Sequence, residues 1–264
     1  MRLWASALAG LLAATPSGAQ REAALSGPRA SYPFTVGENL EFDAKLGILT
    51  LGHAALNVAR IDTVRGQETY LFRFTVEGGT FFFKITSALE SWAGTSDLVS
   101  RRFHTISHEN DRTYQHTYEI YPDSGHFREI GHDTLLETPP EPLDEMAFFY
   151  FVRVTPLEVG KTYQYPRYFK KEFNPVTIKV LKREKMSLPD GDKVDCLLLN
   201  PVVGNQGFFA PRADARVWLT DDSRRLPVQI RSRQPWGVLT LELTGIGTTA
   251  SSPPPGADSN QPGP

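Results

Sequence analysis

Acidic and basic residues with the potential for chemistry meet in the segment WLTDDSRRLP, Trp218–Pro227. Two adjacent aspartates, Asp221 and Asp222, precede the basic pair Arg224 and Arg225. Carboxylates beside guanidinium groups can serve acid–base catalysis or bind an anion. Acid–base work by two carboxylates needs a buried or shielded setting that separates their pKa values.

The residues around this cluster favour a hairpin turn. Arg216–Thr220 and Val228–Arg233 both alternate between apolar and polar residues, as strands do. Asp and Ser stabilise turns through bonds to the backbone, and Pro227, which cannot donate to a ladder, fits the start of a strand. We therefore interpret the charges as the solvated tip of a hairpin rather than as a catalytic site.

Three of the six histidines are crowded into RFHTISHENDRTYQHTYEIY. If Glu109–Asp111 forms a three-residue hairpin loop, His104 and His116 face each other and share one side of the ladder with His108. A loop one residue shorter puts His116 on the opposite face. A fourth ligand at recognisable spacing is missing and Arg112 opposes a cation, so we interpret these side chains as solvated strand histidines and expect no metal.

The remaining candidates give no catalytic assignment. Asp43, Glu77, Glu90 and Asp144 are the acidic residues nearest to apolar stretches, but nothing pairs any two at a glycosidase separation of roughly 5 to 9.5 Å. Cys196, the single cysteine, lies in KVDCLLLNP without a basic neighbour, which indicates a buried structural thiol. The sequence also lacks a nucleophile elbow, a phosphate loop and a G-x-G-x-x-G motif. We expect no catalytic residue, no cofactor and no enzymatic activity.

Most of the chain is predicted to form strands. In Val238–Thr244 the residues Leu239, Leu241 and Leu243 alternate with the others, which indicates a strand with one buried face. Similar patterns occur at 40–46, 51–61, 69–76, 81–92, 98–106, 113–121, 176–183 and 194–201. The connections are too short for crossover helices, so neighbouring strands must pair antiparallel. About a dozen such strands predict a mainly β fold, an antiparallel up-and-down barrel or half-barrel around an apolar interior.

One segment, Leu143–Val154, is expected to be a short buried helix. Asp144 and Glu145 stand at its start and Arg153 at its end, the charge order that a helix dipole favours, with Asp144 as N-cap. Its aromatic residues surround it on nearly all sides, so it should be buried, plugging the end of the barrel. A buried strand is the alternative, since aromatic residues also favour sheets.

Two phenylalanine-rich segments are candidates for lining the interior, but we favour ordinary core packing as their explanation. The candidates are FFFK at Phe81–Lys84 and GFF at Gly207–Phe209. Asn205, Gln206 and Gly207 fall in a predicted loop before two phenylalanines, where a polar mouth would border an apolar pocket.

The two ends of the chain differ from its middle. Residues 1–19 resemble a secretory signal peptide cleaved after Ala19, with a membrane anchor as the alternative. We expect a flexible segment at 20–31, one β-rich domain at 32–247 and a disordered Pro-rich tail, or a surface spacer, at 248–264. The mature chain should be periplasmic or secreted, without a transmembrane segment. A formal net charge of −2 argues against nucleic-acid binding.

Three segments in order resemble the exported bacterial proteins grouped as domain of unknown function 3108. They are FTVGENLEFDAKLGILTLGHAALNV, LDEMAFFYFVRVTPLEVGKTYQY and WLTDDSRRLPVQIRSRQPWGVLTLEL, and the resemblance covers about residues 33–246. It implies a mainly antiparallel, barrel-like domain in the cell envelope. It implies no established activity, so no catalytic residue carries over.

These observations leave three hypotheses. The leading one is a non-enzymatic envelope protein that binds a lipid or another apolar or amphipathic molecule in the curled sheet. The second is a scaffolding protein of the periplasm with a packed interior, whose partner is another envelope protein. The third is a hydrolase of an envelope polymer.

Overall fold

The computed structural model describes residues 31–80, 83–205, 208–235 and 237–248. The predicted signal peptide, nearly all of the predicted flexible segment and the tail beyond residue 248 lie outside the described residues. The predictions for those segments, and the domain boundaries, therefore stay predictions.

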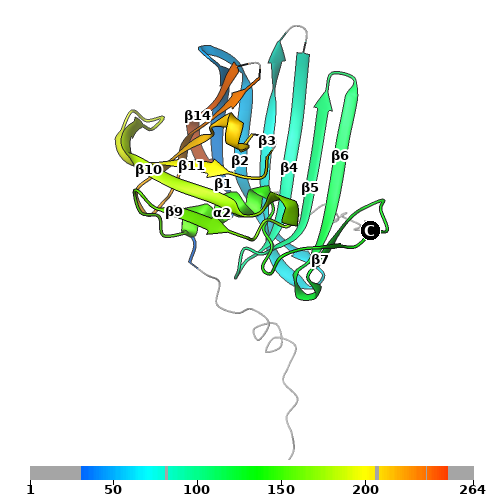
Figure 1. Cartoon of the computed structure of the whole chain (residues 1–264). Helices are drawn as coiled ribbons and strands as arrows, with labels where there is room; N and C mark the ends of the chain where they lie inside the picture. The colour runs from blue at the N-terminus through cyan, green and yellow to red at the C-terminus, as the bar shows by residue number, and fades with distance from the viewer. Residues whose placement is uncertain (1–30, 81–82, 206–207, 236, 249–264) are drawn as a thin grey trace, which may run out of the picture.

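The described residues form one sheet of fourteen strands and one α-helix, shown in Figure 1. The first eight strands are β1 (Glu38–Leu46), β2 (Leu49–Val64), β3 (Gln67–Thr80), β4 (Phe83–Gly94), β5 (Ser100–Glu109), β6 (Arg112–Tyr121), β7 (His126–Glu129) and β8 (Leu136–Glu137). Helix α2 (Glu145–Val154) follows. The last six strands are β9 (Thr162–Tyr165), β10 (Val176–Ser187), β11 (Lys193–Val202), β12 (Arg216–Thr220), β13 (Pro227–Gln234) and β14 (Gly237–Thr248). Three short 3-10 helices, Pro122–Ser124, Lys171–Phe173 and Pro211–Ala213, lie in connections.

The strand order makes the sheet an open half-barrel. It runs β8-β7-β6-β5-β4-β3-β2-β1-β14-β13-β12-β11-β10-β9, with every neighbouring pair antiparallel. The first and last strands, β1 and β14, pair in the middle, and the edge strands β8 and β9 are consecutive along the chain. The prediction of a mainly antiparallel half-barrel is confirmed, and the sheet does not close.

Short turns produce this meander. Arg65 and Gly66 connect β2 to β3 with φ angles of 49° and 78°. Two-residue hairpin turns with positive φ at both positions match the twist of the flanking strands. Such turns keep successive strands adjacent, so the strands follow chain order outward from β1 to β8 and inward from β9 to β14.

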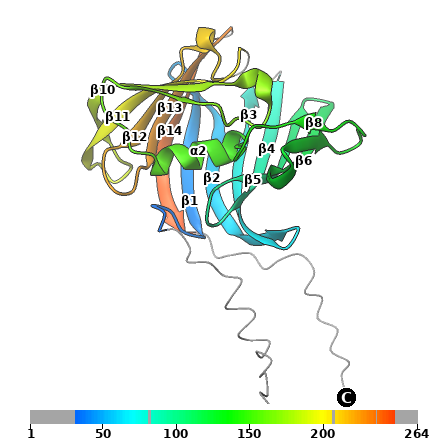
Figure 2. The same cartoon turned by 60° about the horizontal axis from the view of Figure 1, so that its bottom comes forward.

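The connection between the two edge strands carries α2 across the inside of the curl. Figure 2 shows the helix between β3 and β4 on one side and β13 and β14 on the other. Asp144 is its N-cap, and its side chain accepts hydrogen bonds from the backbone N–H groups of Met146 and Ala147 at 2.9 Å each. The predicted helix and its cap are confirmed, and the alternative of a buried strand is wrong.

Buried polar groups hold the start of α2 on the sheet. Ser91 of β4 donates a hydrogen bond to Asp144 Oδ2 at 2.7 Å, and the backbone N–H of Asp144 donates to Ser100 Oγ at 2.7 Å. Burial raises the pKa of the Asp144 carboxyl to about 7, against the opposing effect of these hydrogen bonds. The helix therefore begins at a fixed point of the sheet.

Arg153 fixes the other end of α2. Its guanidinium is fully buried and donates to both carboxylate oxygens of Glu38 in β1, at 2.6 and 2.9 Å. It also donates to the backbone carbonyls of Arg224 and Arg225 at 3.2 Å each. This bidentate geometry is the favourable one for an Arg–carboxylate pair, and it ties the helix to β1 and to the turn after β12.

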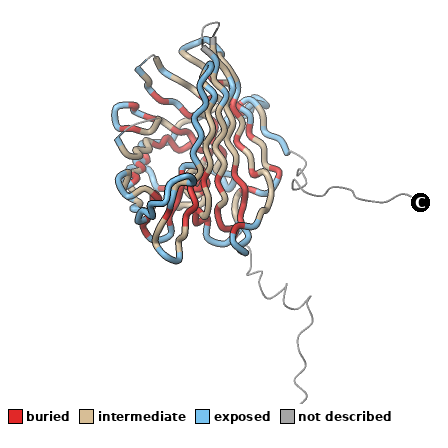
Figure 3. Tube along the Cα trace, turned by 90° about the vertical axis from the view of Figure 1, so that its right-hand side faces the viewer, coloured by how far each residue is buried: buried red, intermediate tan, exposed pale blue. Residues whose placement is uncertain are grey.

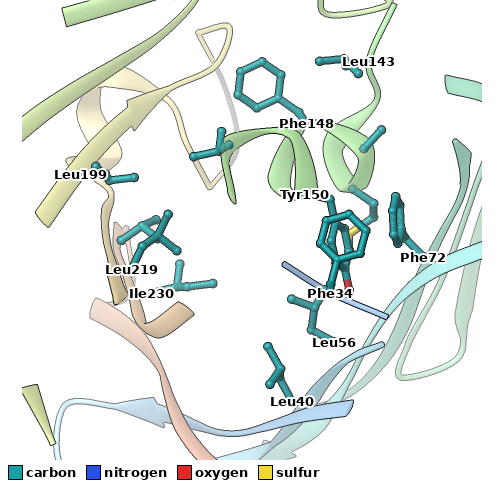
Figure 4. Close-up of a cluster of buried hydrophobic side chains, with 14 of the residues drawn as sticks. Phe34, Leu40, Leu56, Phe72, Leu143, Phe148, Tyr150, Leu199, Leu219 and Ile230 are labelled. Atoms are coloured by element: carbon teal, nitrogen blue, oxygen red, sulfur yellow. The ribbon is translucent and has the colours of Figure 1, made fainter. Parts of the chain in front are cut away.

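Aromatic packing fills the space between α2 and β3. The ring of Tyr150 stacks on Phe72 with centroids 3.7 Å apart and meets Phe34 edge-on at 4.8 Å. Figure 4 shows these three side chains together below the helix, with Leu219 and Ile230 across from them. The core is therefore densest where the helix touches β3 and β4.

Burial along the strands falls with distance from this contact, as Figure 3 shows. Phe72 of β3 is fully buried. Phe74 and Val76 follow it at steps of two and so point to the same concave face, but they are only partly buried. The concave sheet surface beyond α2 is therefore apolar and incompletely covered.

Candidate functional site

An apolar cavity lies between α2 and the concave face of the sheet. It measures about 440 Å³, and almost all of its wall is hydrocarbon. The wall is made by Phe42, Leu56, Phe74, Val76, Leu89, Glu145, Met146, Phe149, Tyr168, Phe173, Val203, Phe208, Phe209, Ile230, Leu239 and Leu241. Binding sites for small molecules have volumes of roughly 300 to 1,000 Å³ and mostly apolar walls.

Strand register builds one wall of the cavity. Leu56 of β2 pairs with Phe74 of β3, and Phe74 pairs with Leu89 of β4. Directly opposed residues project from the same face of a sheet, so this row forms a continuous apolar strip. Leu241 and Ile230 pair in the same way on the opposite side of the curl.

A loop with two phenylalanines adds another wall. Phe208 and Phe209 line the cavity, and the backbone N–H of Val203 donates to the Phe209 carbonyl at 2.9 Å. Gly204 has a φ of +57°, and a Cβ there would lie 2.7 Å from the Phe173 ring. Glycine is therefore required for the loop to approach Phe173.

The predictions about lining residues are partly tested. Phe208 and Phe209 line the cavity and also pack against the core, so both explanations considered for them apply in part. Asn205, expected at a polar mouth, is exposed. Its neighbours Gln206 and Gly207 lie outside the described residues, as do Phe81 and Phe82.

Two polar side chains stand in this apolar wall. The Tyr168 hydroxyl donates a hydrogen bond to Glu145 Oε1. Both residues also line an adjoining cavity of about 70 Å³, so the pair sits between two hollows. The Glu145 side chain is solvent-exposed at the start of α2, and part of it lines the cavity. Sequence reasoning assigned Glu145 only to the helix dipole and did not identify Tyr168.

Desolvation by the surrounding protein atoms is the largest influence on the pKa values of Glu145 and Tyr168. It raises the pKa of Glu145, while the hydrogen bond from Tyr168 and the Lys170 ammonium act in the opposite direction. Burial, with the Glu145 charge next to it, also raises the pKa of Tyr168 well above its ordinary value. Tyr168 is therefore a permanent donor at neutral pH, and Glu145 is a carboxyl whose charge the protein solvates poorly.

The DDSRR cluster is a structural turn. The segment joins β12 to β13 as predicted, and Asp222 Oδ1 accepts hydrogen bonds from Thr220 Oγ1 at 2.6 Å and from the backbone N–H of Arg224 at 3.0 Å. Burial pulls the pKa of Asp222 upward, but these bonds outweigh it and leave the pKa below its ordinary value. Asp221 accepts from Arg183 Nε at 2.5 Å. Asp222 stabilises the hairpin turn, and Asp221 connects the turn to β10 through Arg183.

Of the two loop lengths considered for the histidine segment, the structure has the shorter one, so His104 and His116 do not face each other. Glu109 pairs with Arg112, so the loop is the two residues Asn110 and Asp111, and His104 opposes Thr117. His104 Nδ1 lies 2.8 Å from Thr117 Oγ1. His108 Nδ1 lies 2.8 Å from Thr113 Oγ1, and His116 Nδ1 lies 2.5 Å from Glu129 Oε1. The described residues contain no group of three or more His, Cys, Asp or Glu side chains arranged to hold a metal.

The remaining candidate residues have separate structural roles. Glu90 forms a salt bridge with Arg73, in which Oε1 lies 2.6 Å from Nη2. Asp43 Oδ1 lies 3.1 Å from His53 Nδ1. Glu77 is exposed, and Asp144 caps α2. None of these four acids lines the cavity described above.

Cys196 is buried, and burial together with the charges of Asp222 and Asp195 raises its pKa to about 12. It is therefore an inert thiol at neutral pH.

Comparison with known proteins identifies the family and the fold. The family model described as "Protein of unknown function (DUF3108)" matches residues 41–244. No curated protein matches the chain. A beta-barrel-like protein of domain of unknown function DUF1849 from Brucella abortus is similar in structure, with a TM-score of 0.50, 9% identity, and coverage of 81% of this chain and 98% of that chain. A "putative lipoprotein" from Parabacteroides distasonis aligns with a TM-score of 0.34 and 8% identity over 81% of this chain and 97% of that one.

The Brucella structure supports the half-barrel fold alone. No helix in the described part of the chain is long and apolar enough to span a membrane.

Proposed function

Because the chain belongs to the DUF3108 family, whose function is unknown, we propose a function from its own cavity. The protein is a non-enzymatic binding protein of the bacterial cell envelope that holds the apolar part of a lipid-like molecule inside the half-barrel. The observation that carries this proposal is the apolar cavity of about 440 Å³ between α2 and the sheet.

The clamped helix supports this proposal. α2 is fixed to the sheet by Asp144 at one end and by Arg153 at the other, so it is held across the curl without filling it. A wall that stays in place without a ligand lowers the ordering cost of binding. The partly covered side chains of Phe74, Val76 and Leu89 then gain burial when a ligand enters.

The other hypotheses gain less support. A scaffold without a pocket predicts a packed interior, whereas the interior here is hollow. A polymer hydrolase needs two converging carboxylates, and Glu145 is the single acid among the described residues that line the cavity. The predicted signal peptide and the resemblance to exported proteins motivate the envelope location.

A fluorescence titration tests the proposal. The apolar dye N-phenyl-1-naphthylamine should bind the purified protein with saturable enhancement, and 1-decanol should displace it. Leu89→Trp places a larger side chain inside the cavity, whereas Ala88→Trp places the same side chain on the opposite face of β4 and is the matched control. If the Trp excludes two methylenes at about 0.8 kcal/mol each, binding weakens about fifteenfold.

The expected result is weak binding by Leu89→Trp and unchanged binding by Ala88→Trp, with both variants melting cooperatively. Each methylene added to a short alkanol should strengthen wild-type binding about fourfold until the cavity is full. Equal dye binding by Leu89→Trp and the wild type would show that the cavity is not the binding site. Absence of saturable binding by the wild type would contradict the proposed function itself.

A further inference from the structure

We propose that the cavity selects amphipathic molecules whose polar end donates a hydrogen bond, such as an alcohol or an alkylammonium, and rejects fatty carboxylates. This inference rests on the proposed binding function and adds the chemistry of the ligand's polar group. The Glu145–Tyr168 pair is the selecting element.

The first argument is the free accepting capacity of Glu145. Two carboxylate oxygens offer about four lone-pair positions, and Tyr168 is the side chain among the described residues that hydrogen-bonds to it. Glu145 is the first residue of α2 and projects into the cavity. A donor at the end of a bound chain therefore finds an oxygen acceptor at the cavity wall.

The second argument is that, among the described residues, the lining of the cavity contains Glu145 as its one charged side chain and no Lys, Arg or His. The Lys170 ammonium donates to the Tyr118 hydroxyl at 3.0 Å and lies 4.2 Å from the Tyr118 ring centre. The backbone N–H groups of Met146 and Ala147 are taken by Asp144. A ligand carboxylate in the cavity would thus meet the charge of Glu145 without a cationic side chain in the described lining to receive it.

The third argument is the apolar surrounding. Phe149, Phe209 and Val203 stand beside the pair in both cavities. Apolar side chains next to the pair lower the local dielectric, so two like charges there repel more strongly than in bulk water. The raised pKa of Glu145 reflects the same poor solvation.

Displacement of the dye by three ligands with equal chains tests the inference. At pH 7.5 we expect 1-decanol and decylammonium to displace N-phenyl-1-naphthylamine at a lower concentration than decanoate. The difference in concentration should be roughly tenfold or more. Glu145→Gln removes the charge but keeps an acceptor, so decanoate should approach decanol to within about threefold. Glu158→Gln makes the same change at a residue outside the cavity lining and should leave the wild-type ranking intact.

The outcomes separate this inference from the proposed function. Equal displacement by decanol and decanoate in the wild type would overturn the selection while leaving the binding function in place. An unchanged ranking in a folded Glu145→Gln variant would show that Glu145 is not the selecting group. Should Glu145→Gln fail to fold, the wild-type ranking alone decides. Failure of all three ligands to displace the dye would count against the proposed function.

Discussion

Replacing Arg153 should release the end of α2 at a large cost in stability. The perturbation is Arg153→Met, which keeps much of the apolar stem and removes the guanidinium. In the wild type this group is fully buried and bonds to both Glu38 oxygens and to two backbone carbonyls. The substitution leaves those acceptors without their donor.

The expected loss in the free energy of unfolding follows from the burial of the Arg153–Glu38 ion pair. Removing one partner of a buried ion pair costs about 3–5 kcal/mol, because the other charge stays buried without compensation. Since 1 kcal/mol shifts the melting temperature of a chain of this size by about 2–4 °C, the variant should melt about 6–20 °C lower. The free energy of unfolding of a typical domain is only about 5–15 kcal/mol, so the loss is a large part of the total.

Urea unfolding followed by circular dichroism measures this loss. The matched control is Arg233→Met, an exposed arginine of β13 whose replacement should change stability by less than about 0.5 kcal/mol. Adding Glu38→Gln to Arg153→Met should recover part of the loss, since the stranded charge is then gone. A loss below about 1 kcal/mol for Arg153→Met, or no recovery in the double variant, would refute the reasoning.

Two further predictions concern buried groups. Burial raises the pKa of Asp144 from 3.8 to about 7, so the folded chain binds this proton more tightly than the unfolded chain. That contribution to stability is present below about pH 4 and is lost as the pH rises to about 7, by at most about 4 kcal/mol. Asp144→Asn retains the cap and should lack this dependence, so parallel stability–pH curves for wild type and variant would contradict the assignment. Cys196, with a pKa raised to about 12, should react with a disulfide reagent such as dithionitrobenzoate only after urea unfolds the chain, and rapid labelling of the native protein would contradict its burial.

Local sequence patterns predicted most of the fold. Alternation in Val238–Thr244 correctly indicated a strand with a buried face, since Leu241 and Leu243 are buried. The charge order from Asp144 to Arg153 correctly indicated a helix. Both patterns reflect interactions within a few residues, which a sequence displays directly.

The register of the histidine strands stayed open in the sequence because it depends on one loop residue. Asn110 has a φ of 52° and begins a two-residue loop. The pair Asn110-Asp111 itself was the available signal, because Asn and Asp favour two-residue hairpin turns with positive φ. A three-residue loop would have placed His116 opposite His104, whereas in the observed two-residue loop Thr117 takes that position.

The cavity and its polar pair depend on contacts that the sequence does not display. Glu145 follows an N-cap, where an acidic residue is explained by the helix dipole alone. The cavity that Glu145 lines is formed with side chains from β3, from β13 and with Phe208, which are far from Glu145 in the sequence. Tyr168 comes from another connection, 23 positions away along the chain. Sequence reasoning could thus predict an apolar interior but could not show that it is hollow.

The account's central claim is that a ligand chain occupies the space between α2 and the concave sheet. Methyl-labelled protein saturated with 1-decanol allows nuclear Overhauser contacts to be measured between the alkyl chain and individual methyl groups. The account predicts contacts from the chain to Leu89 and Leu241 and none to Ala55, which faces the other side of β2. Contacts confined to Ala55 and its neighbours, or an absence of any contact at saturation, would contradict it.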